Sequence, residues 1–326
     1  MVRCRRRQGA MVMADYVLVH GGQRDGSPWG KVGSPAPRTR SQCLCALLVQ
    51  AREMESAQYG VCEEALIGNT ENEQKLYGEA WNKAFNGYFS DPRIAAPLVR
   101  AVVDVVEASS PMVITDLGGG TGFLLSEIAG SMNPGNAARL VCVDEAAVQL
   151  DDCPDGIDTL DCTVENIERS QLTRDGERLL LCMRSVLHYF GESGLRPLLA
   201  HLRSLLEHGE CFIHQTICIE DERDRETANL LYLRMDTGKW YPSVVGLTEA
   251  LEQEGFRVVS TVPAMPLVLT QAELEERYGV GHDRMKEIRR ELQGLPRSSA
   301  LVEQEDGFSI RLDYTVMSCT ATASLP

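Results

Sequence analysis

The stretch VITDLGGGTG, residues 113–122, runs from an apolar segment into a loop with four glycines, and the sequence FLLSEIAGSM follows at once. This order predicts a buried strand, a tight loop and a helix. Glycine lets the backbone approach a ligand closely because no Cβ stands in the way. The helix N-terminus adds free N–H groups and a partial positive charge. Asp116 lies at the carboxyl end of the strand, where open α/β sheets bind ligands. The stretch therefore predicts a nucleotide-type site.

The spacing of the glycines separates two kinds of nucleotide site. The dinucleotide fingerprint is G-x-G-x-x-G, but counting from Gly118 puts Phe123 at the third glycine, and counting from Gly120 puts Leu125 there. The spacing that fits is D-x-G-x-G-x-G, formed by Asp116, Gly118, Gly120 and Gly122, with Gly119 inside it. This pattern resembles the first motif of class I S-adenosylmethionine-dependent methyltransferases, whose loop passes beneath the methionine part of the cofactor. A glycine turn that merely joins strand to helix is the alternative interpretation.

An acidic residue ends the next predicted strand. The run ARLVCVD ends at Asp144, 22 residues after Gly122, and Glu145 follows it. A carboxylate can accept hydrogen bonds from both hydroxyls of a ribose. The resemblance implies that Asp144 binds the ribose, with Glu145 also at the cofactor. An acid that caps the following helix is an alternative that is compatible with ribose binding.

A third short strand is predicted within IDTLDCTVENI, with Asp161 and Cys162 at its end. In the methyltransferase family this loop borders the adenine, and an acid accepts a hydrogen bond from the exocyclic amine. The resemblance therefore implies that Asp161 and Cys162 line the adenine site. Asp161 as a simple turn residue is an equally open alternative.

The fourth predicted strand and its exit form the run GERLLLCMRSVLHYF. The segment V-L-H-Y is similar to the I-L-H-D or V-L-H-H of many small-molecule methyltransferases. The resemblance implies that Arg184 lies at the cofactor and Tyr189 at the substrate. It also implies that His188 is a general base, because an imidazole can take a hydroxyl proton near neutral pH. Tyr189 stands where that subgroup often has Asp, so a purely structural role for His188 stays open.

Residues 56–110 are expected to form a helical N-terminal segment that closes over the site. Aromatic residues recur at mostly helical spacing in EQKLYGEAWNKAFNGYFSD. Tyr77, Trp81 and Tyr88 are the candidates for substrate or lid contacts. Core packing against the sheet is the alternative for most of these aromatic residues.

From residue 111 the alternation of strands and helices predicts a parallel sheet with helices on both faces. A sixth strand, FRVVSTVPAM, is followed by a predicted helical insertion at 271–294 that could roof a pocket. The run FSIRLDYTVMS then alternates apolar and polar residues, which predicts one last, antiparallel strand beside the sixth. The expected domain over 111–326 is thus α/β and Rossmann-like, with a seven-stranded, mostly parallel sheet whose last strand is antiparallel. Helical lid elements are expected in addition to this sheet.

Residues 1–55 differ from the rest of the chain. They carry nine Lys or Arg and four acidic residues, and they include a stretch rich in Gly, Pro and Ser. The fragment MADYVLVHGGQRDGSPW resembles the start of an α/β-hydrolase, but the G-x-S-x-G nucleophile motif of that fold occurs nowhere in the sequence. We expect a disordered or remnant extension, with a functional start near Met54. A basic targeting segment is the alternative.

Composition limits the class of protein. The net charge of −15 argues against a nucleic-acid binder, whose affinity rests on Lys and Arg. Eleven cysteines without a C-x-x-C pair argue against a zinc site or a disulfide scaffold and favour a cytoplasmic protein. No apolar run approaches the roughly 20 residues of a membrane span.

These features together predict transfer of a methyl group from S-adenosylmethionine to an oxygen, nitrogen or carbon atom of a small organic molecule. No metal, nucleic acid or membrane partner is expected, and a homodimer is a possible assembly. An NAD-dependent oxidoreductase and a non-catalytic S-adenosylmethionine-binding regulator remain the alternatives.

Overall fold

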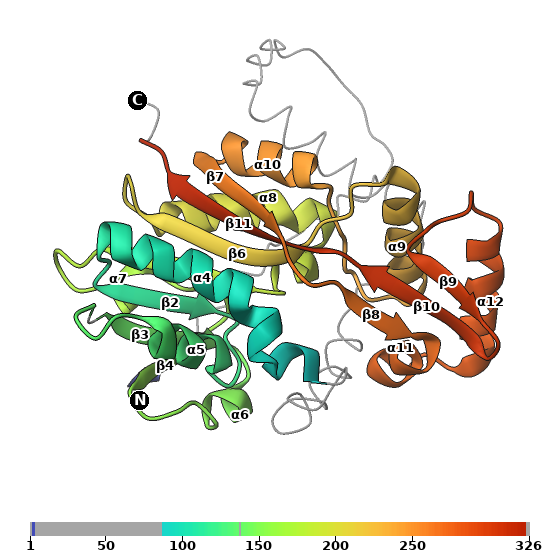
Figure 1. Cartoon of the computed structure of the whole chain (residues 1–326), viewed down its shortest axis with the longest axis horizontal. Coiled ribbons are helices and arrows are strands. Elements are labelled where there is room, and N and C mark those ends of the chain that lie inside the picture. Colours follow the sequence, from blue (N-terminus) through green and yellow to red (C-terminus); the bar gives the residue numbers. More distant parts are fainter. Residues whose placement is uncertain (1, 4–86, 137, 324–326) are drawn as a thin grey trace, which may run out of the picture. The chain divides into compact units, whose positions relative to one another are not determined.

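The computed structural model describes residues 2–3, 87–136 and 138–323, all of which belong to one compact unit. Tyr77 and Trp81, and nearly all of the predicted N-terminal extension, lie outside these ranges. The described part is built around a central sheet that carries helices on both faces, with a smaller sheet beside it (Figure 1).

The central sheet has eight strands in the order β1-β4-β3-β2-β5-β6-β11-β7. Their bounds are β1 (Val2–Arg3), β2 (Val113–Leu117), β3 (Arg139–Asp144), β4 (Ile157–Asp161), β5 (Leu179–Arg184), β6 (Cys211–Ile217), β7 (Phe256–Pro263) and β11 (Tyr314–Ala321). Strands β1 to β6 pair in parallel, and β11 lies antiparallel between β6 and β7. The predicted seven-stranded sheet with an antiparallel last strand is confirmed, and β1 adds a short edge beyond β4.

Two hydrophobic cores lie on opposite faces of this sheet. Neighbouring strand residues point to opposite faces, so Val113 packs in one core and Ile114 in the other. The helices that cover the sheet or connect its strands are α4 (Pro92–Ser109), α5 (Phe123–Ser131), α6 (Ala147–Leu150), α7 (Arg169–Leu172), α8 (Gly191–Ser204), α9 (Glu222–Arg234) and α10 (Val244–Gln253). Leu98 of α4 packs in the core of Ile114, and Leu198 of α8 packs in the core of Val113. The alternation of strands and helices thus gives the predicted layers.

A second, three-stranded antiparallel sheet lies between β7 and β11 in the sequence. Its order is β8-β10-β9, from β8 (Leu267–Thr270), β9 (Leu301–Gln304) and β10 (Gly307–Leu312). The predicted insertion forms two helices, α11 (Gln271–Tyr278) and α12 (His282–Gln293), and the chain breaks between them at Gly279, whose φ is +62°. The helices of the insertion therefore share a core with a sheet that the sequence pattern did not predict.

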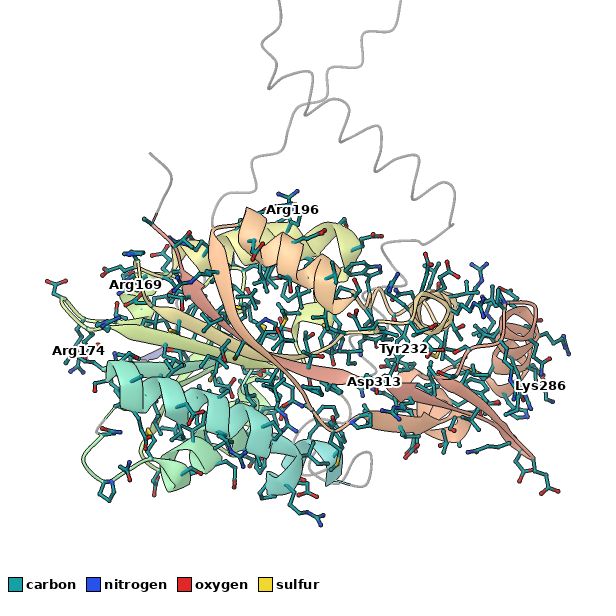
Figure 2. All side chains as sticks on the ribbon, turned by 45° about the horizontal axis from the view of Figure 1, so that its top comes forward. Arg169, Arg174, Arg196, Tyr232, Lys286 and Asp313 are labelled. Carbon is teal, nitrogen blue, oxygen red and sulfur yellow. The ribbon has the colours of Figure 1, made fainter. Side chains whose placement is uncertain are left out.

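The single strand expected over 308–318 is wrong, because the structure divides it at Asp313 (Figure 2). β10 pairs with β8 and β9, whereas β11 pairs with β6 and β7. The alternation of buried and exposed residues continues through Asp313, since Leu312 and Tyr314 are both buried. A local pattern cannot distinguish one long strand from two collinear strands that belong to different sheets.

Candidate active site

The glycine loop after β2 is packed down on the neighbouring strand. The backbone N–H groups of Gly118 and Gly119 both donate to the carbonyl oxygen of Val143, at 2.8 and 3.1 Å. Gly118 and Gly120 have φ values of +70° and +57°, which disfavour residues with a Cβ. At Gly119 an added Cβ would lie 2.7 Å from Cys142 Sγ. The loop therefore needs glycine for its backbone conformation and for close contact with β3.

Asp144 lies at the tip of β3 and holds the glycine loop. Its Oδ2 accepts a hydrogen bond from the Gly120 N–H at 2.9 Å, and its Oδ1 accepts one from the Ala146 N–H at 2.9 Å. Burial raises the pKa of the Asp144 carboxyl, and these hydrogen bonds oppose the rise. Asp144 is not the N-cap residue of α6. That position is Ala146, and no side chain caps the helix there. The carboxylate thus connects the ends of β2 and β3, and each oxygen has a second lone pair for a ligand.

Asp116 lies buried beneath the same loop. Desolvation raises the pKa of its carboxyl to about 7, while the positive charge of Arg184 opposes this rise. Within the described part of the chain, Asp116 Oδ1 and Gln149 Oε1 have no hydrogen-bond partner. Both side chains adjoin the glycine loop, since added Cβ atoms at Gly119 and Gly120 would lie 2.8 Å from Asp116 Oδ2 and 3.2 Å from Gln149 Oε1. Two buried acceptors near the loop fit a ligand that carries N–H donors, such as the amino group of S-adenosylmethionine.

The other predicted cofactor residues extend the same edge of the sheet. Asp161 ends β4 and is paired in register with Asp144. Cys162 is buried, and its N–H donates to the carbonyl oxygen of Asp144 at 3.1 Å. Glu145 is exposed beside Asp144. The carboxyl ends of β2, β3 and β4 therefore bring these residues together, as their positions in the sequence indicate.

Arg184, at the end of β5, binds backbone. Its guanidinium donates to the carbonyl oxygens of Phe89 and Tyr88, which lie in or next to the short helix η1 (Tyr88–Ser90). The Tyr88 hydroxyl donates to the carbonyl oxygen of Met265 at 2.5 Å, and its ring lies 5.6 Å from that of Tyr314. Arg184 and Tyr88 thus fasten the segment before α4 to the sheet and to the chain after β7.

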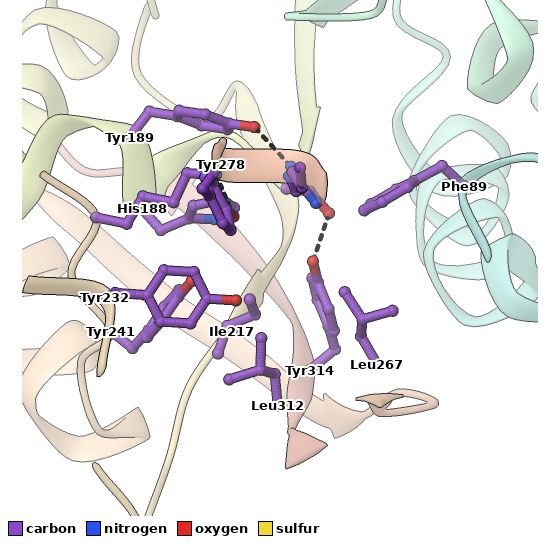
Figure 3. A pocket seen from close by; sticks show the side chains of 13 residues that line it. Phe89, His188, Tyr189, Ile217, Tyr232, Tyr241, Leu267, Tyr278, Leu312 and Tyr314 are labelled. Atoms are coloured by element: carbon purple, nitrogen blue, oxygen red, sulfur yellow. Dashed lines mark hydrogen bonds between the residues drawn. The ribbon is translucent and has the colours of Figure 1, made fainter. Parts of the chain in front are cut away.

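A small pocket with a volume of about 20 Å³ lies next to the end of β5 (Figure 3). His188 and Tyr189 belong to the short helix η2 (Leu187–Phe190) and line the pocket. Their rings stack at 4.6 Å, and His188 is buried. Ser185 also lines the pocket, has a φ of +63°, and donates from Oγ to the Tyr314 hydroxyl at 3.0 Å. His188 and Tyr189 of the V-L-H-Y segment therefore face a cavity.

Sequence reasoning missed much of the pocket wall. The missed lining residues are Phe89, Ser185, Ile217, Tyr232, Lys239, Tyr241, Leu267, Arg277, Tyr278, Leu312 and Tyr314. Lys239 follows α9, and Arg277 and Tyr278 end α11, so the expected insertion does contribute to the pocket. The only sequence signal is the placing of a cation next to aromatic residues, in KWY at 239–241 and RY at 277–278. That signal is too common on protein surfaces to identify a pocket by itself.

Comparison with known proteins supports the fold. No protein-family model and no curated protein matches the sequence. A proposed methyltransferase of Bacillus halodurans is similar in structure, with a TM-score of 0.55 and 13% identity over 70% of this chain and 100% of that chain. The YcgJ protein of Bacillus subtilis has a TM-score of 0.54 and 13% identity over the same shares. Within the described ranges, no helix has the length and apolarity that crossing a bilayer requires. The chain has the Rossmann-like fold of class I S-adenosylmethionine-dependent methyltransferases.

Proposed function

We propose that this protein transfers a methyl group from S-adenosylmethionine to a small organic molecule. The observation that carries the proposal is that two features lie at one edge of the sheet. One is the glycine loop, held by Asp144. The other is the pocket at the end of β5. β2 and β5 are paired neighbours, so a cofactor on the loop is adjacent to the pocket.

The residues on the loop side suit the parts of the cofactor. Asp144 would accept from the ribose hydroxyls, and Asp161 with Cys162 would border the adenine. The glycine loop would lie against the methionine part, whose amino group suits the buried oxygen of Asp116. Arg184 would support this site indirectly, through the charge that it places near Asp116.

S-adenosylmethionine supplies a methyl group on a positively charged sulfur, which becomes a neutral thioether as an acceptor atom forms the new bond to the methyl carbon. The protein's part is then mainly to orient the acceptor and exclude water, which can contribute about 7–11 kcal/mol. His188 would take the proton that a hydroxyl acceptor loses. Its buried position in the pocket wall supports this role.

The two alternatives fit the structure less well. The NAD-dependent fold has a parallel sheet with the dinucleotide fingerprint on its first turn, whereas here β11 is antiparallel and the third glycine of that fingerprint is missing. A non-catalytic regulator has no need of an acceptor cavity, whereas a polar and aromatic pocket lies beside the end of β5, the strand paired with β2. A homodimer and a cytoplasmic location also belong to this proposal; light scattering and fractionation would test them.

Calorimetry of the full chain with S-adenosylhomocysteine and with NAD tests the cofactor. We expect binding of S-adenosylhomocysteine and none of NAD, and the reverse result would contradict the proposal. If S-adenosylhomocysteine binds, transfer of label from methyl-labelled S-adenosylmethionine to a panel of small molecules tests catalysis. Absence of transfer to every member of a panel that includes phenols, amines and carboxylates would favour the regulatory alternative.

A further inference from the structure

Two cysteine side chains lie beneath the glycine loop, and the proposed methyl transfer uses neither of them. Cys142 belongs to β3 and is fully buried. Cys153 lies in the turn that follows α6 and is half-buried. The Sγ atoms of both lie close to the carbonyl oxygen of Gly120, at 3.5 and 3.6 Å. A strand and a turn thus bring two thiols to one point of the loop.

Each sulfur atom also lies against another glycine of the loop. A Cβ added to Gly119 would lie 2.7 Å from Cys142 Sγ. A Cβ added to Gly122 would lie 3.0 Å from Cys153 Sγ. The two sulfur atoms therefore pack against the loop itself, so a change in their positions affects the path of its backbone.

The two thiols differ in reactivity. A hydrogen bond with the Cys142 thiol lowers the pKa of Cys153, while burial and nearby carboxylates oppose this effect. The same hydrogen bond, together with burial, raises the pKa of Cys142. The thiolate is the form of cysteine that acts as a nucleophile. The half-buried Cys153 is therefore the thiol that reacts first, and the buried Cys142 is the thiol that follows.

A third thiol in the same core has another partner. Cys182 of β5 packs in the core that contains Cys142, and Cys153 packs against that core. Cys182 is fully buried, and its thiol hydrogen-bonds to the carboxyl of Asp116. Cys142 and Cys153 are therefore the two thiols that the loop brings together.

We propose that Cys142 and Cys153 are an oxidation site, at which hydrogen peroxide converts the two thiols into a disulfide that weakens binding at the glycine loop. The formation of the disulfide rests on the two thiols alone. Its effect on S-adenosylmethionine rests on the proposed methyl transfer.

The oxidation takes two steps. The Cys153 thiolate attacks one oxygen of the peroxide, so that an S–O bond forms and the O–O bond breaks. The departing hydroxide takes up the proton that Cys153 released, which gives water and leaves Cys153 as a sulfenic acid. The Cys142 sulfur then attacks the Cys153 sulfur: an S–S bond forms, the S–O bond breaks, and hydroxide leaves with the Cys142 proton as a second water. The thiols lose two electrons and two protons, and one peroxide becomes two waters.

The disulfide changes the surroundings of Gly120. It brings the sulfur atoms to about 2.05 Å from each other and removes the two S–H groups beside the Gly120 carbonyl oxygen. The N–H of the same residue donates to Asp144 Oδ2 at 2.9 Å. A shift of Gly120 therefore moves the loop relative to the carboxylate that is proposed to bind the ribose. Asp152 and Asp155, on either side of Cys153, are exposed, so the turn can move towards β3.

Peptide mapping of the full chain tests the disulfide. The reduced protein is treated with hydrogen peroxide, the remaining thiols are blocked with iodoacetamide, and the chain is cut after glutamate. Glu145 lies between the two cysteines, so a linked pair of peptides reports the bond, and fragmentation of the pair separates Cys153 from Cys162. We expect the Cys142–Cys153 link at peroxide concentrations that leave Cys211 reduced. Absence of this link at every concentration would overturn the proposal.

Calorimetry with S-adenosylhomocysteine, before and after treatment with peroxide, tests the effect on the site. We expect the oxidised protein to bind about tenfold more weakly, which corresponds to the loss of about one hydrogen bond. Dithiothreitol should restore the affinity, because it reduces the disulfide. An equal affinity of the reduced and the linked protein would contradict the effect on the loop.

Variants connect the loss of affinity to this pair of thiols. Cys153→Ser keeps the shape of the side chain but cannot form the bond, so peroxide should leave its affinity unchanged. The matched control is Cys211→Ser, which removes another half-buried thiol and should respond to peroxide as the parent does. Circular dichroism shows whether each variant folds, and peptide mapping of the unmodified chain decides the matter if Cys153→Ser does not. A loss of affinity in Cys153→Ser equal to that of the parent would refute the role of the pair.

The failures of the two proposals can be told apart. If the link forms but the reduced protein does not bind S-adenosylhomocysteine, the oxidation site stands and the methyl-transfer proposal is wrong. If S-adenosylhomocysteine binds but no link forms, the methyl-transfer proposal stands and the oxidation site is wrong.

Discussion

Arg184 holds the backbone of Phe89, a residue 95 positions earlier, through a 2.8 Å hydrogen bond from its Nη1 to the carbonyl oxygen. A second bond from Nη2 reaches the carbonyl oxygen of Tyr88 at 3.3 Å. The same guanidinium lies near enough to Asp116 to oppose the rise in the pKa that burial gives that carboxyl. One side chain at the end of β5 thus connects the cofactor side of the site with the pocket wall that Phe89 forms.

The change Arg184→Gln should therefore weaken both sides of the site. We expect a loss of about 1–3 kcal/mol in the free energy of unfolding, because two partly buried backbone acceptors lose a charged donor. Urea denaturation measures this loss. The matched control, Arg100→Gln, alters an exposed arginine of α4 and should change stability little. Equal stability of the two variants would refute the positioning role of Arg184.

Asp144→Asn should weaken the binding of S-adenosylhomocysteine about tenfold to a hundredfold. The amide keeps the shape but loses the charge, and it can no longer accept from the Gly120 N–H and the Ala146 N–H through both positions. Calorimetry measures the affinity. Asp152→Asn, at an exposed position nearby, serves as the control. An unchanged affinity in Asp144→Asn would exclude the ribose role.

His188→Gln should lower turnover about 10²–10⁴-fold with a hydroxyl acceptor, the range for loss of a general base. Binding of S-adenosylhomocysteine should not change, because His188 lies in the pocket wall and the cofactor residues lie on the glycine loop. Single-turnover measurements over a range of pH separate this effect from product release. His208→Gln is the exposed control. Full turnover in His188→Gln would leave His188 a structural residue.

Asp116 makes stability depend on pH in a direction that can be calculated. Its pKa is about 7 in the folded protein and near 3.8 in the unfolded chain, so the folded state binds the proton more tightly. The stability of the unliganded protein therefore falls as pH rises between these values. The parent protein loses this contribution and Asp116→Asn does not. The free energy of unfolding of the variant, relative to that of the parent, should therefore rise by about 3 kcal/mol from pH 5 to pH 8. Urea denaturation of both proteins at the two pH values measures the difference, and a parallel pH dependence of the two would contradict it.

The succession of strands and helices in the main sheet could be predicted because strands such as β2, β3 and β5 are nearly continuous in hydrophobicity and end at a punctuating residue. Asp144 could be located from the sequence alone, since it ends a buried run and the carboxyl ends of parallel strands share one edge. The glycine spacing could be interpreted because backbone conformation depends on local residues. These features are encoded within short windows of sequence.

The pocket wall could not be predicted in the same way. Lys239 and Arg277 line one pocket because α9 and α11 share a hydrophobic core with the second sheet, and no local window contains both. Arg184 was predicted at the cofactor, but its hydrogen bonds go to the backbone of Phe89 and Tyr88, which a strand-end position does not reveal. Contacts between distant segments depend on how complete elements pack.

The segment that forms the second sheet begins at the end of β7 and ends at the start of β11, and these two points are neighbours. The N–H of Ala264, just after β7, donates to the carbonyl oxygen of Tyr314, the first residue of β11, at 2.8 Å. The whole segment 264–313 is thus the loop of a hairpin, and a short turn could replace it without disturbing the strand pairing of β7 and β11. Such an exchange would remove Arg277 and Tyr278 and leave the glycine loop and Asp144 intact. Evolution, or an engineer, could therefore exchange this part of the pocket wall as a cassette while the half with the glycine loop is inherited unchanged.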